Sequence, residues 1–283
     1  MLDVQDDHTV TPNIKDMRVI MKSLANNVVV VTGAGSGIGR ALALQLAAQG
    51  AHLALCDVNA DNLQKTVDIA SAHGVKVYSA TVDVANRQAV QTFADNVSRA
   101  LGNASVIINN AGVALSQNVD TMSRQDFEWV LNINFWGVVN GCEAFMPQLK
   151  QQGDAHIVNI SSIFGIISVP SQSAYNASKF AVKGFTESLR QELNGSKIHV
   201  TCVHPGGIKT NIVRHARIHN DISGHAVSPQ KLAADFDKMA STSAEEAARQ
   251  IVRAIEKNQK RLLIGADAKV LDAVQRLLPN HYD

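Results

Sequence analysis

Tyr175 and Lys179 are the two residues whose types and spacing most directly predict chemistry in this sequence. They stand four residues apart and apolar residues recur at helical intervals after them, so both side chains are expected on one face of a helix. An ammonium group about 4 Å from a phenol would lower its pKa by roughly three units at an effective dielectric constant near 20. That phenol could exchange protons near neutral pH. An isolated pair of this kind is more often exposed on a helix surface, so the rest of the chain must decide.

The composition limits the classes of protein to which the chain can belong. It has 283 residues, 46% of them apolar and 18% charged, and a formal net charge of +1. This length supports a substantial core, and the charge gives no basic field that would recruit nucleic acid or an anionic membrane. No apolar run reaches the ~18–20 residues of a membrane span, and the N-terminus lacks the apolar segment of a signal peptide. We therefore expect a globular protein without nucleic-acid or membrane partners.

The three cysteines indicate a reducing compartment. Cys56, Cys142 and Cys202 lie in apolar runs that have no metal-ligand spacing. Buried thiols fit the cytoplasm better than they fit a disulfide framework. We therefore expect a cytoplasmic protein that binds no metal.

A glycine-rich turn lies between a predicted strand and a predicted helix near the start of the chain. Residues 28–31 are four valines, typical of a strand buried on both faces, and residues 32–39 read TGAGSGIG before an apolar-periodic helix. The glycines allow a tight turn and a close approach to the backbone, and the start of the helix offers free N–H groups to a pyrophosphate. This order of strand, turn and helix predicts a dinucleotide-binding site.

Asp57 ends the next predicted strand, residues 52–56, and stands 22 residues beyond Gly35. The separation is close to the ~20 residues expected for a carboxylate that binds an adenosine ribose. Such a carboxylate accepts hydrogen bonds from the ribose hydroxyls and repels a 2′-phosphate. We therefore predict NAD as the cofactor and consider NADP less favoured. Arg40, just after the glycine turn, keeps NADP open as an alternative.

Strands continue to alternate with helices along the chain, which predicts an α/β fold with a Rossmann-type, doubly wound parallel sheet. Residues 1–24 show no periodicity and are expected to form a flexible extension, whereas residues 25–283 are expected to form one domain. Residues 211–241 are irregular and follow a predicted strand, so we expect a substrate lid there. The predicted strands are residues 28–31, 52–56, 75–80, 105–108, 156–161, 198–203 and 261–264, and the predicted helices after the glycine turn are residues 59–73, 87–100, 124–151, 174–194, 243–257 and 268–278.

Five motifs, in order, resemble the short-chain dehydrogenase/reductase family from about residue 27 to about residue 264. The turn at residues 32–39 matches the family's TGxxxGxG pattern. Residues 83–84, 109–112 and 205–210 resemble the segments that meet adenine, lie behind the nucleotide and flank the nicotinamide. The resemblance implies cofactor contacts at Gly33, Ser36, Gly37, Ile38, Gly39, Asp57, Asp83, Val84, Asn110, Ala111, Gly112, Tyr175, Lys179, Pro205, Gly206, Ile208 and Thr210.

The same resemblance implies a catalytic tetrad of Asn134, Ser162, Tyr175 and Lys179, in which the spacing to Tyr175 selects Ser162 rather than Ser161. Tyr175 would be the general acid or base, and Lys179 would lower its pKa and hold the nicotinamide ribose. Ser162 would donate a hydrogen bond to the substrate oxygen, and Asn134 would hold a water that links Lys179 to solvent. His204 is expected to be a packed, hydrogen-bonded histidine.

These residues predict an NAD-dependent oxidoreductase that acts on a small-molecule secondary alcohol or its ketone. Two alternatives remain open: an NADP-dependent 3-ketoacyl reductase, which Asp57 argues against, and a non-catalytic nucleotide-binding regulator, which the intact tetrad argues against.

The segments expected around the reacting carbon, residues 113–115, 163–166 and 208–213, are mostly apolar. They favour an uncharged alkyl or cyclic substrate. The rival is an anionic substrate held by Arg214, His215 or Arg217. The family resemblance also implies a homodimer or homotetramer that assembles through the predicted helices 124–151 and 174–194.

Overall fold

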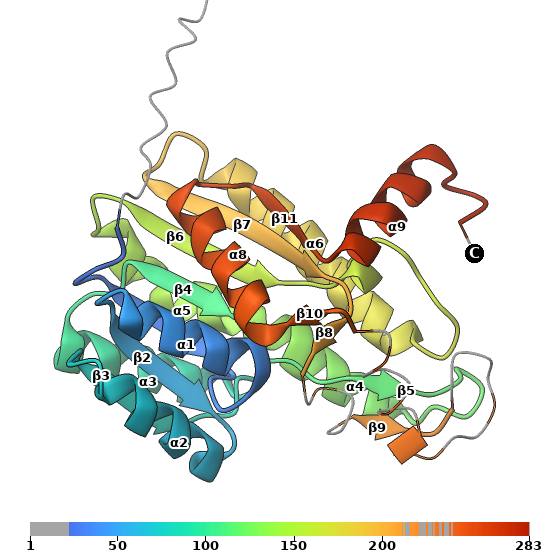
Figure 1. The fold of residues 1–283 in the computed structure, drawn as a ribbon, viewed down its shortest axis with the longest axis horizontal. Helices are drawn as coiled ribbons and strands as arrows, with labels where there is room; N and C mark the ends of the chain where they lie inside the picture. Colours follow the sequence, from blue (N-terminus) through green and yellow to red (C-terminus); the bar gives the residue numbers. More distant parts are fainter. Residues whose placement is uncertain are drawn as a thin grey trace, which may run out of the picture.

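The computed structural model describes residues 23–282 except 211, 213–215, 221–224, 226–227, 229, 232–233, 235–237 and 239. These residues form a central parallel sheet of seven strands in the order β11-β7-β6-β4-β1-β2-β3 (Figure 1). The predicted doubly wound fold is confirmed, and the strand order reverses between β1 and β4. The strands are β1 Val28–Thr32, β2 His52–Asp57, β3 Val77–Thr81, β4 Val106–Asn109, β6 Ala155–Ile160, β7 Ile198–Pro205 and β11 Arg261–Ile264.

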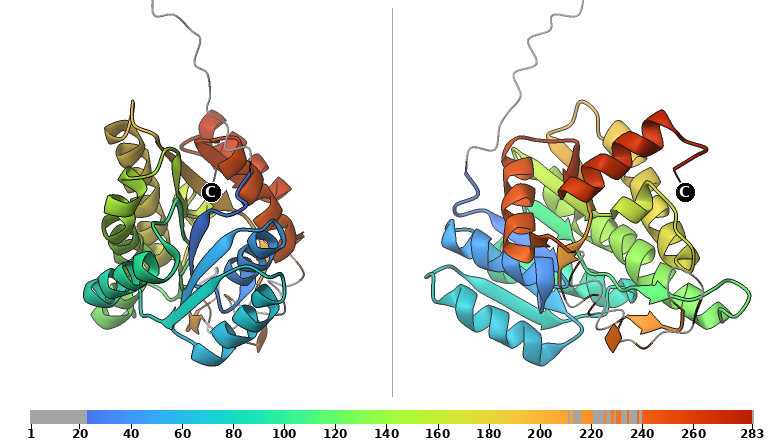
Figure 2. Two further views of the ribbon diagram at one scale, coloured as in Figure 1. Left: turned by 90° about the vertical axis from the view of Figure 1, so that its left-hand side faces the viewer. Right: turned by 45° about the vertical axis from the view of Figure 1, so that its right-hand side comes forward.

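Helices cover both faces of this sheet, as the left view of Figure 2 shows. One face packs against α1 (Gly37–Ala48), α2 (Ala60–Ser71) and α8 (Ala244–Glu256). The opposite face packs against α3 (Arg87–Leu101), α5 (Gly137–Lys150) and α6 (Ser173–Glu192). No helix among the described residues is long and apolar enough to cross a membrane.

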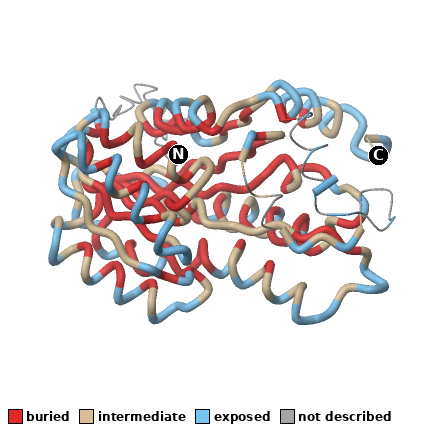
Figure 3. The backbone as a smooth tube through the Cα atoms, turned by 60° about the horizontal axis from the view of Figure 1, so that its bottom comes forward, coloured by how far each residue is buried: buried red, intermediate tan, exposed pale blue. Residues whose placement is uncertain are grey.

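The valine run of β1 shows why both faces need helices. Val29 and Val31 belong to one apolar cluster, and Val28 and Val30 belong to the cluster on the other side. Successive side chains of a strand point to opposite faces, so a strand without polar residues is stable only when both faces are covered. Figure 3 shows that buried residues, in red, run through the centre of the molecule.

Two short strand pairs bring the chain after β7 back to the carboxyl end of the sheet. Strand β8 (Ile208–Lys209) pairs in parallel with β10 (Thr242–Ser243). Strand β5 (Leu115–Ser116) pairs in parallel with β9 (Arg217–Ile218). The predicted lid therefore contains at least one ordered strand, and much of the rest of residues 211–241 lies outside the described residues.

The prediction of one continuous helix over residues 124–151 is wrong in one respect. The chain forms α4 (Arg124–Leu131), a wider π-helical turn η1 (Asn132–Trp136), and then α5. A π-helical turn places an extra residue in one turn of the helix and often occurs at functional sites. Its central residue is Asn134, which the sequence analysis assigned to the catalytic tetrad.

The predicted flexible extension needs a correction at its end. Residues 1–22 lie outside the described residues, but Leu24 is only 1% exposed and packs into the apolar cluster beneath α1. The ordered fold therefore begins at or before Leu24. At the other end, α9 (Ala266–Leu277) follows β11 and projects from the sheet toward the C-terminus (Figure 1).

Candidate active site

The glycine turn after β1 is too tight for side chains. Gly33 has a φ of 67°, which side chains disfavour, and a Cβ on Gly39 would lie 2.1 Å from the Gly33 carbonyl oxygen. The helix that follows is uncapped: Ser36 makes no side-chain capping bond and the first turn of α1 holds no acidic residue. Helices α2 and α3, by contrast, are capped by Asn59 and Asn86. The free N–H groups of α1 and the space beside the glycines fit a pyrophosphate, as the sequence predicted.

Asp57 is held rigidly at the end of β2. Its carboxylate accepts hydrogen bonds from the N–H groups of Gly35 and Asn59, both at 2.8 Å. Arg40 donates to the Gly35 carbonyl at 2.5 Å, to the Asn62 carbonyl at 3.1 Å and to a threonine hydroxyl of α2 at 3.0 Å. The guanidinium of Arg40 is therefore already occupied by three partners of the protein itself.

The other predicted cofactor residues gather along the carboxyl edge of the sheet. The N–H groups of Asn110 and Ala111 both donate to the Thr32 hydroxyl at 3.0 Å, which joins the ends of β1 and β4 where the strand order reverses. A Cβ on Gly37 would lie 3.2 Å from the side chain of Thr210, so these two residues are in close contact. The carbonyl of Val84, after β3, accepts a hydrogen bond from a buried amide of α5 at 2.9 Å.

Ser162, Tyr175 and Lys179 meet at the same edge, one after β6 and two on α6. All three are buried, with exposed fractions of 8%, 9% and 4%. The Ser162 hydroxyl acts on the Tyr175 phenol and, against the larger effect of burial, lowers its pKa, and the Lys179 ammonium lies 5.6 Å from the centroid of the tyrosine ring. The view of Tyr175 and Lys179 as an exposed pair on a helix surface is thus excluded.

Burial controls the protonation of this pair. It raises the pKa of Tyr175 to about 12, with the Ser162 hydrogen bond as a weaker opposing effect. It also lowers the pKa of Lys179 to about 8. The expected lowering of the Tyr175 pKa by Lys179 is therefore wrong for the structure as described. The Lys179 ammonium donates instead to the Ile160 carbonyl at 3.1 Å.

Asn134 lies beside Lys179, across Gly112. A Cβ on Gly112 would lie 3.2 Å from the Asn134 amide oxygen and 3.5 Å from the Lys179 nitrogen. The amide oxygen accepts from the Val113 N–H at 2.8 Å, and the amide nitrogen donates to the Val113 carbonyl at 3.0 Å and to the Ser178 hydroxyl at 3.1 Å. The side chain thus fixes the backbone after β4, and its role toward a water stays a prediction.

The predicted apolar wall around the substrate needs a partial correction. Ile163 and Ile166 are 5% and 6% exposed and pack in one cluster with Ala268 of α9, so they face the C-terminal helix rather than an open site. Phe164 is the residue of this segment that meets the phenol of Tyr175. Its ring lies edge-on to that of Tyr175, with centroids 6.2 Å apart.

Arg217 is not free to hold an anionic substrate. It donates to Asp126 at 2.6 Å, and its guanidinium carbon lies 3.9 Å from the centroid of the Trp129 ring. This arrangement fastens β9 to α4. Arg214 and His215, the other residues of the proposed anion clamp, lie outside the described residues.

His204 and Asn176 complete the surroundings of Ser162. His204 is packed as predicted, with Nδ1 3.1 Å from the Ser162 carbonyl oxygen, and burial lowers its pKa to about 4. Asn176 was missed in the sequence analysis although it directly follows Tyr175. Its amide nitrogen donates to the carbonyls of Phe164 and Ile167. A buried amide inside a helix must find partners, and that was the available signal.

A glycine turn at the reversal point of a doubly wound sheet, with a buried Ser–Tyr–Lys set beside it, defines a Rossmann-type oxidoreductase. The family model described as short chain dehydrogenase matches residues 27–221. The chain belongs to the short-chain dehydrogenase/reductase family, as the motif resemblance predicted.

Known proteins resemble the chain over most of its length. A Mycobacterium tuberculosis protein named "Putative oxidoreductase SadH" is 49% identical over 265 residues, covering 93% of this chain and 94% of that protein. Estradiol 17-beta-dehydrogenase 11 of Macaca fascicularis is 30% identical, covering 92% and 82%. A Burkholderia phymatum short chain dehydrogenase/reductase solved in complex with NAD has a TM-score of 0.80 and 32% identity, covering 90% and 96%.

Proposed function

We propose that this protein is an NAD-dependent oxidoreductase that transfers hydride between the cofactor and a secondary alcohol or its ketone. The observation that carries the proposal is the buried contact of Tyr175 with Ser162 and Lys179 beside the glycine turn. The nicotinamide ring supplies or accepts the hydride when the cofactor is bound. The Burkholderia phymatum neighbour was solved with NAD, and levodione reductase, with a TM-score of 0.76 and 26% identity, bears a name that indicates a carbonyl substrate.

Each catalytic residue has a separate task in this proposal. Tyr175 donates its proton to the substrate oxygen in reduction and accepts one in oxidation. Its raised pKa, about 12, keeps the phenol protonated at neutral pH and ready for reduction. Ser162 donates a hydrogen bond to the same oxygen, Lys179 holds the ribose hydroxyls, and Asn134 fixes the Val113 backbone while a water links Lys179 to solvent.

Asp57 supports NAD rather than NADP. A carboxylate at the end of β2 accepts hydrogen bonds from ribose hydroxyls and repels a phosphate. Arg40 is the nearby cation that could favour NADP, but its Nε and Nη2 groups already donate to the protein. The NADP-dependent 3-ketoacyl reductase is therefore the weaker alternative. A non-catalytic regulator is weaker still, because it gains nothing from burying a tyrosine beside a lysine.

The substrate is an uncharged molecule with an apolar or cyclic body. Phe164 places an aromatic ring beside the Tyr175 phenol, and an apolar body gains binding free energy when it is buried there. The engagement of Arg217 by Asp126 and Trp129 removes one of the cations on which an anionic substrate would depend.

We propose the assembly, domain organisation and location that the sequence predicts. We place a homodimer or homotetramer contact on η1 and α6, where Trp136 and Phe180 are 51% and 40% exposed. Residues 25–283 form one domain in this proposal, with the lid at about 211–241. The three free, buried cysteines support a cytoplasmic location.

A panel of cyclic and open-chain ketones and alcohols, assayed with NAD(H) and with NADP(H), tests the proposal. The reduced-nicotinamide absorbance should change with at least one apolar secondary alcohol or ketone, faster with NAD(H). Tyr175→Phe serves as the blank. Turnover that is absent throughout, or equal in the wild-type protein and Tyr175→Phe, contradicts the proposal.

A further inference from the structure

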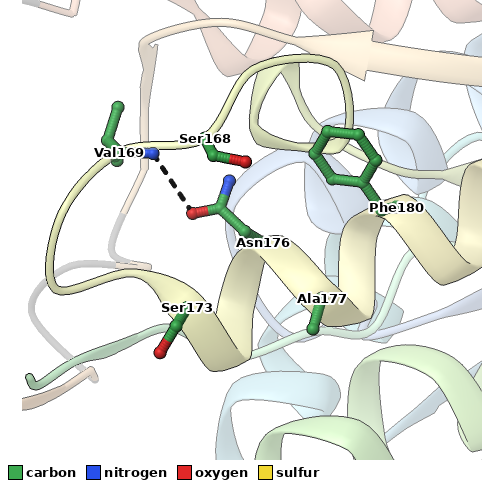
Figure 4. A pocket seen from close by; sticks show the side chains of 6 residues that line it. All are labelled: Ser168, Val169, Ser173, Asn176, Ala177 and Phe180. Atoms are coloured by element: carbon green, nitrogen blue, oxygen red, sulfur yellow. Dashed lines mark hydrogen bonds between the residues drawn. The ribbon is translucent and has the colours of Figure 1, made fainter. Parts of the chain in front are cut away.

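Asn176 ties the loop after the catalytic serine to the helix that carries the catalytic tyrosine. Its side-chain nitrogen donates two hydrogen bonds of 2.8 Å, to the carbonyls of Phe164 and Ile167. Its oxygen accepts one of 3.5 Å from the Val169 N–H, which Figure 4 shows. An asparagine amide has two N–H donors, so both are used here. The side chain is 5% exposed, and its partners span residues 164–169.

The same loop is fitted to α6 one turn further along. The Ser161 hydroxyl donates to the Lys179 carbonyl at 2.9 Å, and a Cβ on Gly165 would lie 2.7 Å from that carbonyl oxygen. The loop therefore touches α6 at two heights, through Asn176 and through the backbone of Lys179. Tyr175 directly precedes the first of these contacts, Asn176, and stands four residues before the second, Lys179.

The loop in turn places two groups that face the phenol. The Phe164 N–H donates to the Ser162 hydroxyl oxygen at 3.1 Å, so the backbone of Phe164 orients the hydroxyl that acts on the Tyr175 phenol. The Phe164 ring meets the Tyr175 ring edge-on, at 6.2 Å and an interplanar angle of 87°. Any displacement of the Phe164 backbone moves both of these contacts.

Packing gives this loop little support on its outer side. A hollow of about 410 Å³ lies there, lined by Ser168, Val169, Ser173, Asn176, Ala177 and Phe180 (Figure 4). None of the catalytic residues lines this hollow, so it is separate from the site. At this hollow the hydrogen bonds of Asn176 hold the loop, in addition to the apolar cluster that its isoleucines form with Ala268.

We propose that Asn176 is a positioning residue that sets the register of Ser162 against Tyr175 and holds Phe164 as the wall of the substrate site beside the phenol. The inference rests on the proposed function and names the part of the site that limits substrate size. The buried carbonyls of Phe164 and Ile167 lose their donors when the amide is removed, and an unsatisfied buried acceptor drives local rearrangement. The hollow beside Val169 and Asn176 leaves space into which residues 164–169 can then move.

Two substitutions and one control test the proposal. Asn176→Ala removes the three hydrogen bonds, and Asn176→Asp keeps the shape while presenting a carboxylate to two carbonyl oxygens. Gln148→Ala is the control. Gln148 is 7% exposed and bonds to the Ala94 carbonyl and the Ala104 N–H, both at 2.9 Å, so it is a buried amide with two backbone partners away from Ser162 and Tyr175.

The first readouts do not depend on activity. Hydrogen–deuterium exchange of residues 163–169 should become faster in both Asn176 variants and should not change in Gln148→Ala. Asn176→Ala removes the acceptor of the Val169 N–H, and Asn176→Asp places a carboxylate against the carbonyls of Phe164 and Ile167. The dissociation constant of NADH should stay within about twofold of the wild-type value in every variant, since Asn176 touches no predicted cofactor residue other than its chain neighbour Tyr175.

Kinetics at a temperature well below the melting temperature supply the second readout. With cyclohexanone, kcat should fall at least about tenfold in both Asn176 variants, because the near-attack geometry of Ser162 and Tyr175 is lost. The ratio of kcat/KM for a decalone to that for cyclohexanone should rise at least about threefold. Phe164→Ala should raise the same ratio with a smaller loss of kcat. Gln148→Ala should change neither quantity.

The outcomes separate this inference from the proposed function. A wild-type protein that reduces no ketone contradicts the proposed function, and the exchange data then still show whether Asn176 holds the loop. Active Asn176 variants with wild-type kcat and an unchanged size ratio overturn the inference and leave the proposed function intact. Losses of equal size in Gln148→Ala also overturn it, because they would reflect general destabilisation.

Discussion

The Gly35 N–H donates a hydrogen bond of 2.8 Å to the carboxylate of Asp57, 22 residues further along the chain. This bond joins the glycine turn after β1 to the end of β2. A Cβ on Gly35 would lie 2.8 Å from the same carboxylate, so this position requires glycine. Asp57 therefore supports the shape of the turn and also carries the negative charge that faces the ribose in the proposed NAD complex.

Substitution of Asp57 separates these two roles. Asp57→Asn keeps an oxygen that can accept the Gly35 N–H but removes the charge, whereas Asp57→Ala removes both. We expect the ratio of kcat/KM for NADP(H) to kcat/KM for NAD(H) to rise at least about tenfold in both variants. Asp57→Ala should in addition weaken NAD(H) binding. A wild-type enzyme that prefers NADP(H) would show that Arg40 outweighs Asp57.

Tyr175→Phe removes the proposed proton donor and keeps the ring that packs against Phe164. Turnover should fall by about 10²–10⁴, the usual cost of losing a general acid–base group. The dissociation constant of NADH, measured by fluorescence, should change little because the cofactor site keeps its shape. Turnover near the wild-type value would exclude Tyr175 as the proton donor.

The buried histidines predict how stability depends on pH. Burial lowers the pKa of His204 to about 4 and that of His156 to about 3, whereas an unfolded histidine titrates near 6.5. Between these values the unfolded state binds more protons, so stability is full above pH ~6.5 and is lost as the pH falls toward 4. Each histidine contributes a slope of up to about 1.4 kcal/mol per pH unit.

Urea unfolding at several pH values between 5 and 7.5 checks this slope. His204 contacts the Ser162 carbonyl, and Lys183, Glu187 and Arg261 act on it through their charges. His204→Asn should reduce the slope of the unfolding free energy against pH by up to about 1.4 kcal/mol per pH unit, which corresponds to one proton. The slope that remains comes from His156. An unchanged slope would show that His204 is protonated in the folded protein.

Arg217→Ala should loosen β9 without changing selectivity for charged substrates. The variant loses the bond to Asp126 and the stacking on Trp129, so KM for an apolar ketone should rise a few-fold and Trp129 fluorescence should change. Arg124→Ala, which breaks an exposed pair with Glu128 on the same helix, is the control. If Arg217→Ala instead lost activity selectively toward a hydroxy acid, that result would support the alternative of an anionic substrate held by Arg217.

Light scattering at micromolar concentration should give the mass of a dimer or tetramer. Phe180→Glu places a charge on the exposed face of α6 and should reduce that mass. Val119→Glu changes a residue that is 72% exposed on a loop and should leave the mass unchanged. A monomeric wild-type protein would contradict the proposed assembly.

The sequence by itself determined the fold and which candidate residues lie together at the carboxyl edge of the sheet. The four valines at residues 28–31, the TGAGSGIG turn and the four-residue spacing of Tyr175 and Lys179 are local patterns, and local backbone geometry decides which side chains share a strand face or a helix face. The sequence predicts one continuous helix over residues 124–151 and no π-helical turn. The reason is that the amide of Asn134 finds its partners, the Val113 backbone and Ser178, only in the folded chain.

Only the tertiary structure decided protonation and the partners of the polar side chains. The Lys179 ammonium donates a hydrogen bond to the Ile160 carbonyl and is buried together with Tyr175. Desolvation therefore outweighs the lowering of the Tyr175 pKa that the spacing alone predicted. Arg217 and Asp126 lie 91 residues apart in the chain, and their bond follows from the pairing of β9 with β5. Desolvation and long-range contacts sum over elements distant in sequence, and residue spacing contains no record of them.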